Sequence, residues 1–325
     1  MLINPNAKYI YLDWNVIKYM KEPRLDKNDV DIAFKQTIFQ LKKKYKFPYS
    51  MAHIKDRANN YKKEYYNNVK EDFDFAETIN DMNCVAVYNG SPVITKEPML
   101  KCFENYIIGP EAKLSIPRED MICSFNVDMS QIDTSHPMYD LLNSCGGTYS
   151  AENMQVFLTE MYDSIFKDTV KYKKLREYIK NTDFESSLNQ KYPLGEQLLL
   201  SKLLYHMFPF LDSFQDDEET LIKKWPEIAK SWFSLNNMHL SCDLLLIQGY
   251  ALLDLHPLFN EKLKKDKNSL DNMIRDGNHC FYASKAQYFV SEDAYTRRKI
   301  TFLYSAYCIK TKVVDEAAFM HCFEY

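Results

Sequence analysis

Three aspartates follow short segments whose composition predicts β-strands. Asp13 comes directly after the β-prone segment 8–12, and Asp56 and Asp293 stand close behind two later segments of the same kind. Functional groups collect at the carboxyl ends of the strands in open parallel sheets. We therefore expect these three carboxylates to lie at one edge of a sheet. The two later strand segments are residues 47–51 and 288–291.

A fourth aspartate, Asp276, lies in the predicted helix 269–286, which leads into the strand before Asp293. Offsets of three and seven residues share one face of a helix, so Asp276, His279 and Ala283 lie on the same face. The small Ala283 side chain lets this helix pack closely on the sheet. Asp276 is thereby directed towards the same edge as the other acids.

Four carboxylates at one edge repel one another unless a cation lies between them. Oxygen ligands without sulfur favour Mg²⁺ or Mn²⁺ over zinc. Such ions turn water into a nucleophile and stabilise the attacking and leaving oxygens of a phosphodiester. We predict metal-dependent phosphodiester hydrolysis, with Asp13, Asp276 and Asp293 as metal ligands and Asp56 as the fourth acid. One of the carboxylates would also accept the proton of the attacking water.

The elements that must position these acids alternate between strand and helix at both ends of the chain, which indicates a parallel sheet in an α/β fold. We predict a core formed by residues 1–80 and 240–325, with residues 81–239 as a mostly helical insertion. The helices expected in the core are 29–45, 57–80, 240–255, 269–286 and 294–309, and the last strand is 312–314. Those expected in the insertion are 151–179, 194–213 and 217–234.

Composition narrows the class of protein. The chain has 325 residues, with 41 basic against 45 acidic side chains, which excludes a globally cationic nucleic-acid-binding protein but permits a local basic patch. It has seven glycines and neither GxGxxG nor GxxxxGK[ST], which argues against a dinucleotide site or a P-loop. No signal peptide and no apolar run of membrane-spanning length are expected. The eight cysteines form no CxxC, so we predict reduced, buried thiols and a cytoplasmic protein.

Two N-terminal segments resemble motifs of the PIN-domain nucleases. Leu-Asp-Trp-Asn at residues 12–15 resembles the first motif, an Asp after the first strand with Asn or Ser two residues later. Ser-Met-Ala-His-Ile-Lys-Asp at residues 50–56 resembles the second motif, in which a strand leads into a helix that carries an acid. The family's usual acid there is Glu, so Asp56, whose side chain is shorter, departs from the motif.

Three C-terminal segments resemble the remaining motifs. Residues 276–283 match an Asp with Ala seven residues later, and residues 291–293 match a Thr/Ser-x-Asp that follows a strand. Residues 311–319 resemble the family's last strand and short helix. The resemblance as a whole covers about residues 1–79 and 265–325.

The resemblance implies a PIN-like (Rossmann-like) parallel sheet of order 3-2-1-4-5 and a divalent-metal-dependent endoribonuclease that uses Mg²⁺ or Mn²⁺. Nucleic acid, and RNA in particular, would be its partner. Stand-alone members of this class often serve in toxin or defence systems, which implies an inhibitory partner protein. The catalytic residues would be Asp13, Asp56, Asp276 and Asp293. Substrate contacts are expected from Asn15, Ser50, His279, Ser291, Arg297, Arg298 and Lys299.

A stretch without acids supports a nucleic-acid partner independently of the resemblance. Between residues 294 and 312 there are five basic side chains and no acidic one, with Tyr295 and further aromatics interleaved. Basic groups just after Asp293 suit a phosphate backbone, and Tyr295 suits stacking on a base. The alternative is a solvated face with aromatic residues in the core. The basic side chains are Arg297, Arg298, Lys299, Lys310 and Lys312.

Other interpretations stay open at this point. Asp13 and Asp293 could each cap the following helix, Glu292 could replace Asp293 as the ligand, and His279 could be structural. A catalytically degenerate PIN-like module that binds RNA or a protein partner agrees with the Asp56 departure and with the formal charge of −4. A phosphatase of the haloacid-dehalogenase type needs a second Asp where Asn15 stands. The sequence leaves open RNA against DNA and the oligomeric state.

Overall fold

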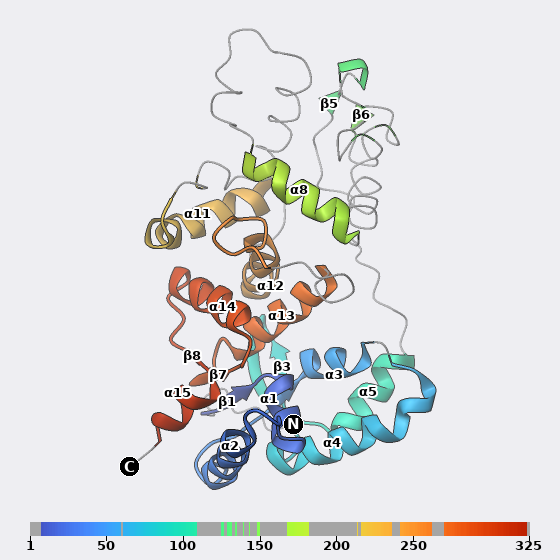
Figure 1. The fold of residues 1–325 in the computed structure, drawn as a ribbon, viewed down its shortest axis with the longest axis vertical. Coiled ribbons are helices and arrows are strands. Elements are labelled where there is room, and N and C mark those ends of the chain that lie inside the picture. Colours follow the sequence, from blue (N-terminus) through green and yellow to red (C-terminus); the bar gives the residue numbers. More distant parts are fainter. Residues whose placement is uncertain are drawn as a thin grey trace. The chain divides into compact units, whose positions relative to one another are not determined.

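The computed structural model describes residues 8–59, 61–108, 168–181, 216–235, 241–261 and 270–323, with a few positions between 125 and 149 and at 213. The described chain is an α/β structure in which helices predominate (Figure 1). None of its described helices combines the length and the apolar character that a membrane-spanning helix requires.

The chain divides into two compact units. The first comprises residues 1–111, 241–251 and 274–325, and the second comprises residues 112–240 and 252–273. The predicted core was 1–80 with 240–325. This division differs from the prediction in two places: residues 81–111 belong to the first unit, where β3 (Asn83–Tyr88) pairs with β2 (Tyr49–Ser50) of the predicted core, and residues 252–273 belong to the second unit.

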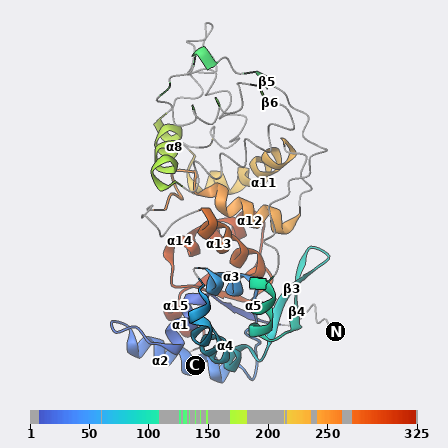
Figure 2. The same ribbon diagram turned by 90° about the vertical axis from the view of Figure 1, so that its right-hand side faces the viewer.

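The first unit contains a parallel sheet built from both ends of the chain. Its strands are β1 (Ile10–Leu12), β7 (Tyr288–Val290) and β8 (Lys312–Val314), in the order β1-β7-β8. β1 and β7 pair in parallel along their whole length, with Leu12 opposite Val290. All of β1 is buried, as expected of a parallel strand that helices cover on both sides. Figures 1 and 2 show α14 on one side of this sheet and α2 and α15 on the other.

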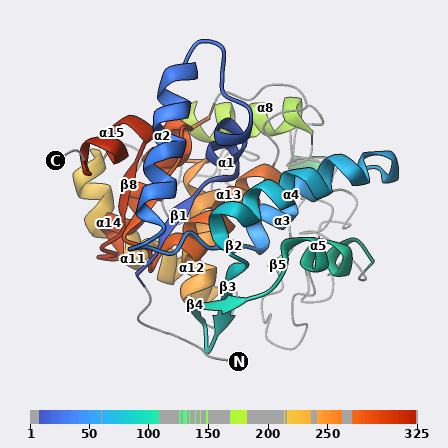
Figure 3. The same ribbon diagram turned by 90° about the horizontal axis from the view of Figure 1, so that it is seen from below.

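A second sheet contains β2 (Tyr49–Ser50), β3 (Asn83–Tyr88) and β4 (Ser91–Lys96). β2 and β3 are parallel, and β3 and β4 form an antiparallel hairpin that lies at the edge of the first unit (Figures 2 and 3). The hairpin turns at Asn89 and Gly90, which both have positive φ, as a two-residue type I′ turn requires. The expectation of a mostly helical region from residue 81 missed this hairpin.

The two sheets are joined by an isolated parallel bridge between Tyr9 and Lys46. Ile10 N donates to Lys46 O at 2.9 Å, just before the chain enters β2. The described residues of the first unit therefore form two three-stranded sheets with one bridge, and not the continuous five-stranded sheet that the family resemblance implied. A separate two-stranded antiparallel sheet pairs β5 (Phe125–Asn126) with β6 (Thr148–Tyr149).

Several helices of the first unit correspond to predicted ones, and three do not. α2, α4 and α14 match the predicted helices 29–45, 57–80 and 294–309, whereas no predicted range covers α1 or α5. α3 lies almost wholly before residue 57, because Ser50 and His53 form a capping box that starts it at Met51. The bounds are α1 (Trp14–Lys21), α2 (Asn28–Leu41), α3 (Met51–Ala58), α4 (Tyr66–Asn80), α5 (Met99–Ile108), α14 (Ala294–Ala306) and α15 (Glu316–His321), with a 3₁₀ turn at Lys63–Tyr65.

Helices α12 (Cys242–Leu253) and α13 (Leu270–Ala283) approach each other very closely in the first unit. A Cβ atom at Gly277 would lie 2.7 Å from the carbonyl oxygen of Ile247 and 3.1 Å from its Cα. Only glycine permits this approach, which explains a poor helix former in the middle of α13. The contact also fixes the rotation of α13, which carries Asp276 and His279.

The second unit contains α8 (Thr169–Asn181) and α11 (Glu218–Leu235). The latter corresponds to the predicted helix 217–234, and α8 corresponds to the end of the predicted helix 151–179, of which residues 151–167 lie outside the described residues. The predicted helix 194–213 lies outside the described residues, apart from Ser213. Buried Asp254 in this unit binds the Tyr172 hydroxyl at 2.8 Å and pairs with Arg176, so it is structurally compensated.

All described cysteines are free thiols, as the sequence predicted. Cys84 and Cys280 are buried, but the expectation that the thiols are buried is wrong for three others. These exposed cysteines are Cys242, Cys308 and Cys322.

Candidate metal centre

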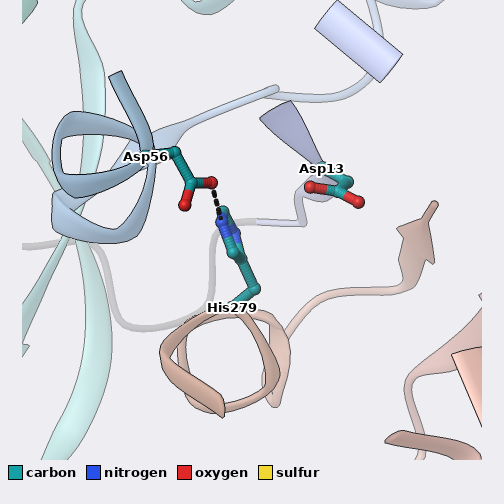
Figure 4. A group of neighbouring side chains, drawn as sticks. All are labelled: Asp13, Asp56 and His279. Carbon is teal, nitrogen blue, oxygen red and sulfur yellow. Dashed lines mark hydrogen bonds and ion pairs between the residues drawn. The ribbon is translucent and has the colours of Figure 1, made fainter. Parts of the chain in front are cut away.

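Asp13, Asp56 and His279 each place one potential ligand atom within 4.8 Å of the others. Asp13 lies at the junction of β1 and α1, Asp56 in the last turns of α3, and His279 on α13. Figure 4 shows the imidazole pointing from α13 towards Asp56, with the Asp13 carboxylate on its other side. Three segments that are distant in the sequence thus converge beyond the carboxyl end of β1.

Asp13 is held by the strand next to it. Its backbone N–H donates to Val290 O at 2.9 Å, and Ser291 Oγ donates to Asp13 Oδ2 at 2.7 Å. Asp13 is also the N-cap residue of α1, but its side chain makes no N-capping hydrogen bond there. Burial raises the pKa of the Asp13 carboxyl group, and the nearby His279 and Ser291 oppose the rise only in part.

Asp56 and His279 form a close pair. His279 Nε2 lies 2.7 Å from Asp56 Oδ2, and Arg275, one turn earlier on α13, reaches Asp56 Oδ1 at 3.4 Å. Burial alone would lower the pKa of His279, but the charge and hydrogen bond of Asp56 outweigh it and raise that pKa. Burial likewise acts to raise the pKa of Asp56, and His279 and Arg275 reverse this and lower it. The pair therefore has the character of an imidazolium and a carboxylate.

A buried hydrogen-bond network lies behind His279. The Tyr11 hydroxyl is 2.9 Å from His279 Nδ1 and 2.5 Å from Ser50 Oγ. His53 Nδ1 accepts from the Ser50 backbone N–H at 3.0 Å, so its Nε2 carries the proton and donates to Leu12 O at 2.8 Å. Burial lowers the pKa of His53 to about 3, which keeps it neutral. His53 is thus a structural residue that orders the start of α3.

The other two predicted metal ligands are placed differently. Asp276 is half-buried on α13, one turn before His279, and its charge contributes to the raised pKa of His279. Asp293 is exposed and caps α14, where its Oδ1 accepts the Thr296 N–H at 2.8 Å. Among the described residues, the group of closely spaced ligand atoms contains neither of them.

The predicted substrate-binding residues lie in different environments. Ser50 and Ser291 are buried, and their hydroxyl groups are hydrogen-bonded inside the first unit. Arg297 donates to Ser291 O at 2.6 Å, while Lys299 is buried with its ammonium 4.9 Å from the centre of the Tyr250 ring. Asn15 and Arg298 are exposed.

A second charged cluster, which the sequence did not reveal, surrounds Arg24 in the loop between α1 and α2. Arg24 pairs with Asp31 at 2.5 Å, Glu292 at 2.9 Å and Glu316 at 2.6 Å, and Lys27 also pairs with Glu292. The Glu292 carboxylate therefore pairs with two basic side chains, Arg24 and Lys27. Nothing local in the sequence indicates this cluster, because its acids come from three separate segments.

Burial and neighbouring charges shift the pKa values of two acids of the Arg24 cluster in opposite directions. Burial, together with the charge of Glu292, raises the pKa of Glu316 to about 8. Burial also acts on Glu292, but its hydrogen bonds with Lys27 and Arg24 prevail and lower the pKa of Glu292 to about 2. Among the described residues, Glu316 Oε1 is buried without a hydrogen-bond partner, which adds to the cost of a charge on this carboxyl group.

Neither a known protein family, nor a curated protein, nor a solved structure matches this chain.

Proposed function

We propose that this protein is a divalent-metal-dependent endonuclease with a PIN-like fold, which hydrolyses phosphodiester bonds of RNA. The observation that carries the proposal is the convergence of Asp13, Asp56 and His279, whose ligand atoms lie within 4.8 Å of one another. Two of the three are acids that the sequence marks at strand ends, and the third stands one helical turn after Asp276.

The residues present fit a divalent ion. Two ligands of one ion are at most about 4.5 Å apart, given metal–ligand bonds of roughly 2.0–2.3 Å, so only small movements are needed. The raised pKa of Asp13 reflects a buried carboxylate whose charge its neighbours compensate incompletely, which is the situation that a cation relieves. When bound, the ion would supply an activated water and charge stabilisation at the phosphate.

The two other predicted ligands, Asp276 and Asp293, are each connected to a residue of the proposed metal centre. Asp276 lies on the same helix as His279, and the Asp293 backbone N–H donates to Ser291 Oγ, the hydroxyl group that also contacts Asp13. We assign Asp276 and Asp293 to the surroundings of the ion, where they would order water or a second ion. Asp56 takes the ligand position that the resemblance gives to a Glu.

The arrangement of strands supports the PIN-like assignment. The bridge between Tyr9 and Lys46 places the start of β2 beside β1. In the proposed PIN-like arrangement this bridge would join the two sheets, so that the parallel strands would follow one another as β3, β2, β1, β7 and β8, in the order 3-2-1-4-5. The site lies beyond the carboxyl end of β1, and open α/β sheets bind ligands at such strand ends.

The first two turns of α14 supply the features that suit a nucleic acid. Tyr295 is 42% exposed and Arg298 is also exposed, and both lie in the helix that follows Ser291 and Asp293. Their chemistry matches a base stacked on an aromatic ring and a phosphate held by a guanidinium group. RNA as the substrate follows from the family resemblance, so the test includes DNA.

The decisive experiment incubates labelled RNA and DNA with the protein in Mg²⁺, Mn²⁺ or EDTA. We expect cleavage of RNA with metal and none with EDTA, and its loss in Asp13→Asn and Asp56→Asn. Asp74→Asn, an exposed acid of α4, is the matched control and should cleave like the parent. Undiminished cleavage by both site variants would refute the assignment of the site.

A role as a toxin or defence effector with an inhibitory partner belongs to the same proposal. Induced expression of the parent protein should then arrest growth, whereas Asp13→Asn at equal protein level should not. Equal growth arrest by the parent and by Asp13→Asn would show that the toxicity does not depend on the proposed cleavage activity.

One observation favours a second candidate, a catalytically degenerate module that binds RNA or a protein partner. Asp56 is already compensated by His279 and Arg275, and Asp13 accepts a hydrogen bond from Ser291. Such internal partners allow the site to persist without an ion. For this candidate, metal would bring neither cleavage nor thermal stabilisation.

A further inference from the structure

We propose that His279 Nε2 is a nitrogen ligand of the metal, that the site therefore takes Mn²⁺ in preference to Mg²⁺, and that Tyr11 is the positioning residue that fixes the imidazole. The inference rests on the proposed function only in taking Asp13, Asp56 and His279 as the metal centre. The sequence suggested an all-carboxylate site and gave no role to Tyr11.

The orientation of the His279 ring is defined on both sides. The residue is 1% exposed, with Nε2 directed at Asp56 and Nδ1 at the Tyr11 hydroxyl, 2.9 Å away. Figure 4 shows the ring edge that faces Asp56. Since Tyr11 occupies Nδ1, only Nε2 is available to an ion between the two carboxylates.

Tyr11 connects the three elements that supply the ligands. It belongs to β1, which ends one residue before Asp13. Its hydroxyl group contacts His279 on α13 and, at 2.5 Å, Ser50 Oγ, the N-cap of the helix that carries Asp56. One buried phenol therefore ties together the strand and both helices of the site.

The hydrogen bonds of Tyr11 select the nitrogen that an ion would use. Without metal, Nε2–H of His279 donates to the Asp56 carboxylate, and an ion would displace this proton. A hydroxyl group can donate one proton and accept others. When Tyr11 donates to Ser50 Oγ, its oxygen accepts Nδ1–H from His279, and Nε2 without its proton offers a lone pair to the ion. Such partners of metal-bound histidines typically change metal affinity by about 10- to 100-fold.

The donor set discriminates between the two candidate ions. Mg²⁺ prefers oxygen ligands and gives up its water reluctantly, whereas imidazole is a good ligand for transition metals. Mn²⁺ accepts both carboxylate and imidazole. A set of two carboxylate oxygens and one nitrogen therefore favours Mn²⁺.

Pulsed electron paramagnetic resonance of Mn²⁺ bound to the full chain tests this ligand directly, without a substrate. We expect nitrogen hyperfine coupling from one imidazole in the parent protein, its loss in His279→Gln, and its retention in His321→Gln, an exposed control on α15. Competition should show Mn²⁺ binding at least about 10-fold more tightly than Mg²⁺.

Tyr11→Phe tests the positioning role. We expect Mn²⁺ affinity to fall about 10- to 100-fold with weakened nitrogen coupling. Tyr9→Phe is the matched control, because Tyr9 is a buried tyrosine next to β1 whose hydroxyl donates to Tyr282 O at 2.8 Å, away from the metal ligands. Unchanged affinity in Tyr11→Phe refutes this role, and the parent spectrum still decides the ligand if that variant does not fold.

The outcomes separate this inference from the proposed function. Bound Mn²⁺ without nitrogen coupling, or equal affinity for Mg²⁺, overturns the inference even if RNA is cleaved. Nitrogen coupling in a protein that cleaves no nucleic acid with any metal supports the inference and refutes the nuclease proposal.

Discussion

Glu316→Gln is expected to remove a pH dependence of stability that the Arg24 cluster creates. The Glu316 side chain is 1% exposed and faces Arg24, Asp31 and Glu292. Its pKa of about 8 means that the folded protein keeps a proton on this carboxyl group at neutral pH. Glutamine reproduces the neutral form, with a similar shape and no charge to acquire.

The magnitude follows from the difference between the two states. The ordinary pKa of 4.5 applies to the unfolded chain, which releases this proton from about pH 4.5 upward, while the folded protein retains it until about pH 8. The stabilisation is therefore fully present below pH 4.5 and is lost as the pH rises through 8. At about 1.4 kcal/mol per pH unit, the loss between pH 4.5 and 7 is on the order of 3 kcal/mol.

Denaturant unfolding between pH 5 and 8 measures this effect. The free energy of unfolding of the parent should fall relative to that of Glu316→Gln as the pH rises, and the variant should be the more stable protein at pH 8. Contributions from Asp13 and His279 are common to both proteins and cancel in the difference. Glu97→Gln, which changes a surface acid, should parallel the parent. A parent-to-variant difference that is constant over this pH range would refute the reasoning.

Four further substitutions have defined outcomes. Asp13→Asn should raise the metal-free unfolding free energy by about 1 kcal/mol, because it removes a buried charge, and abolish thermal stabilisation by Mn²⁺. Gly277→Ala should cost about 1–2 kcal/mol in thermal unfolding, since overpacking against Ile247 outweighs the gain in helix propensity. Arg24→Ala should cost about 3–5 kcal/mol in denaturant unfolding, because the buried Asp31 carboxylate loses its partner. Ser291→Ala should weaken Mn²⁺ binding about 10-fold in a titration, because Asp13 loses its hydrogen bond. An unchanged value in any of these measurements contradicts the contact concerned.

Local sequence patterns located the strands and the first acid well. Segments 8–12, 288–291 and 312–314 correspond to β1, β7 and β8, because short β-prone runs before turn residues are a local signal. The junction after the first strand likewise marked Asp13. The hairpin β3–β4 was missed, since Asn89-Gly90 was not interpreted as a type I′ turn.

Long-range features could not be inferred in the same way. Asp276 and His279 share one face of α13, and the rotation of that helix decides which of them points at Asp56. The contact of Gly277 with Ile247 sets this rotation, and no local pattern predicts such a contact. The Arg24 cluster depends in the same way on acids that only the tertiary fold brings together.

Calorimetric titration of Mn²⁺ into the metal-free protein shows whether Asp13, Asp56 and His279 form a metal centre. We expect one ion per chain, with affinity reduced at least about 10-fold in each of Asp13→Asn, Asp56→Asn and His279→Gln, and unchanged in Asp74→Asn. The absence of saturable binding, or equal affinity in all four variants, would contradict a metal centre formed by these three side chains.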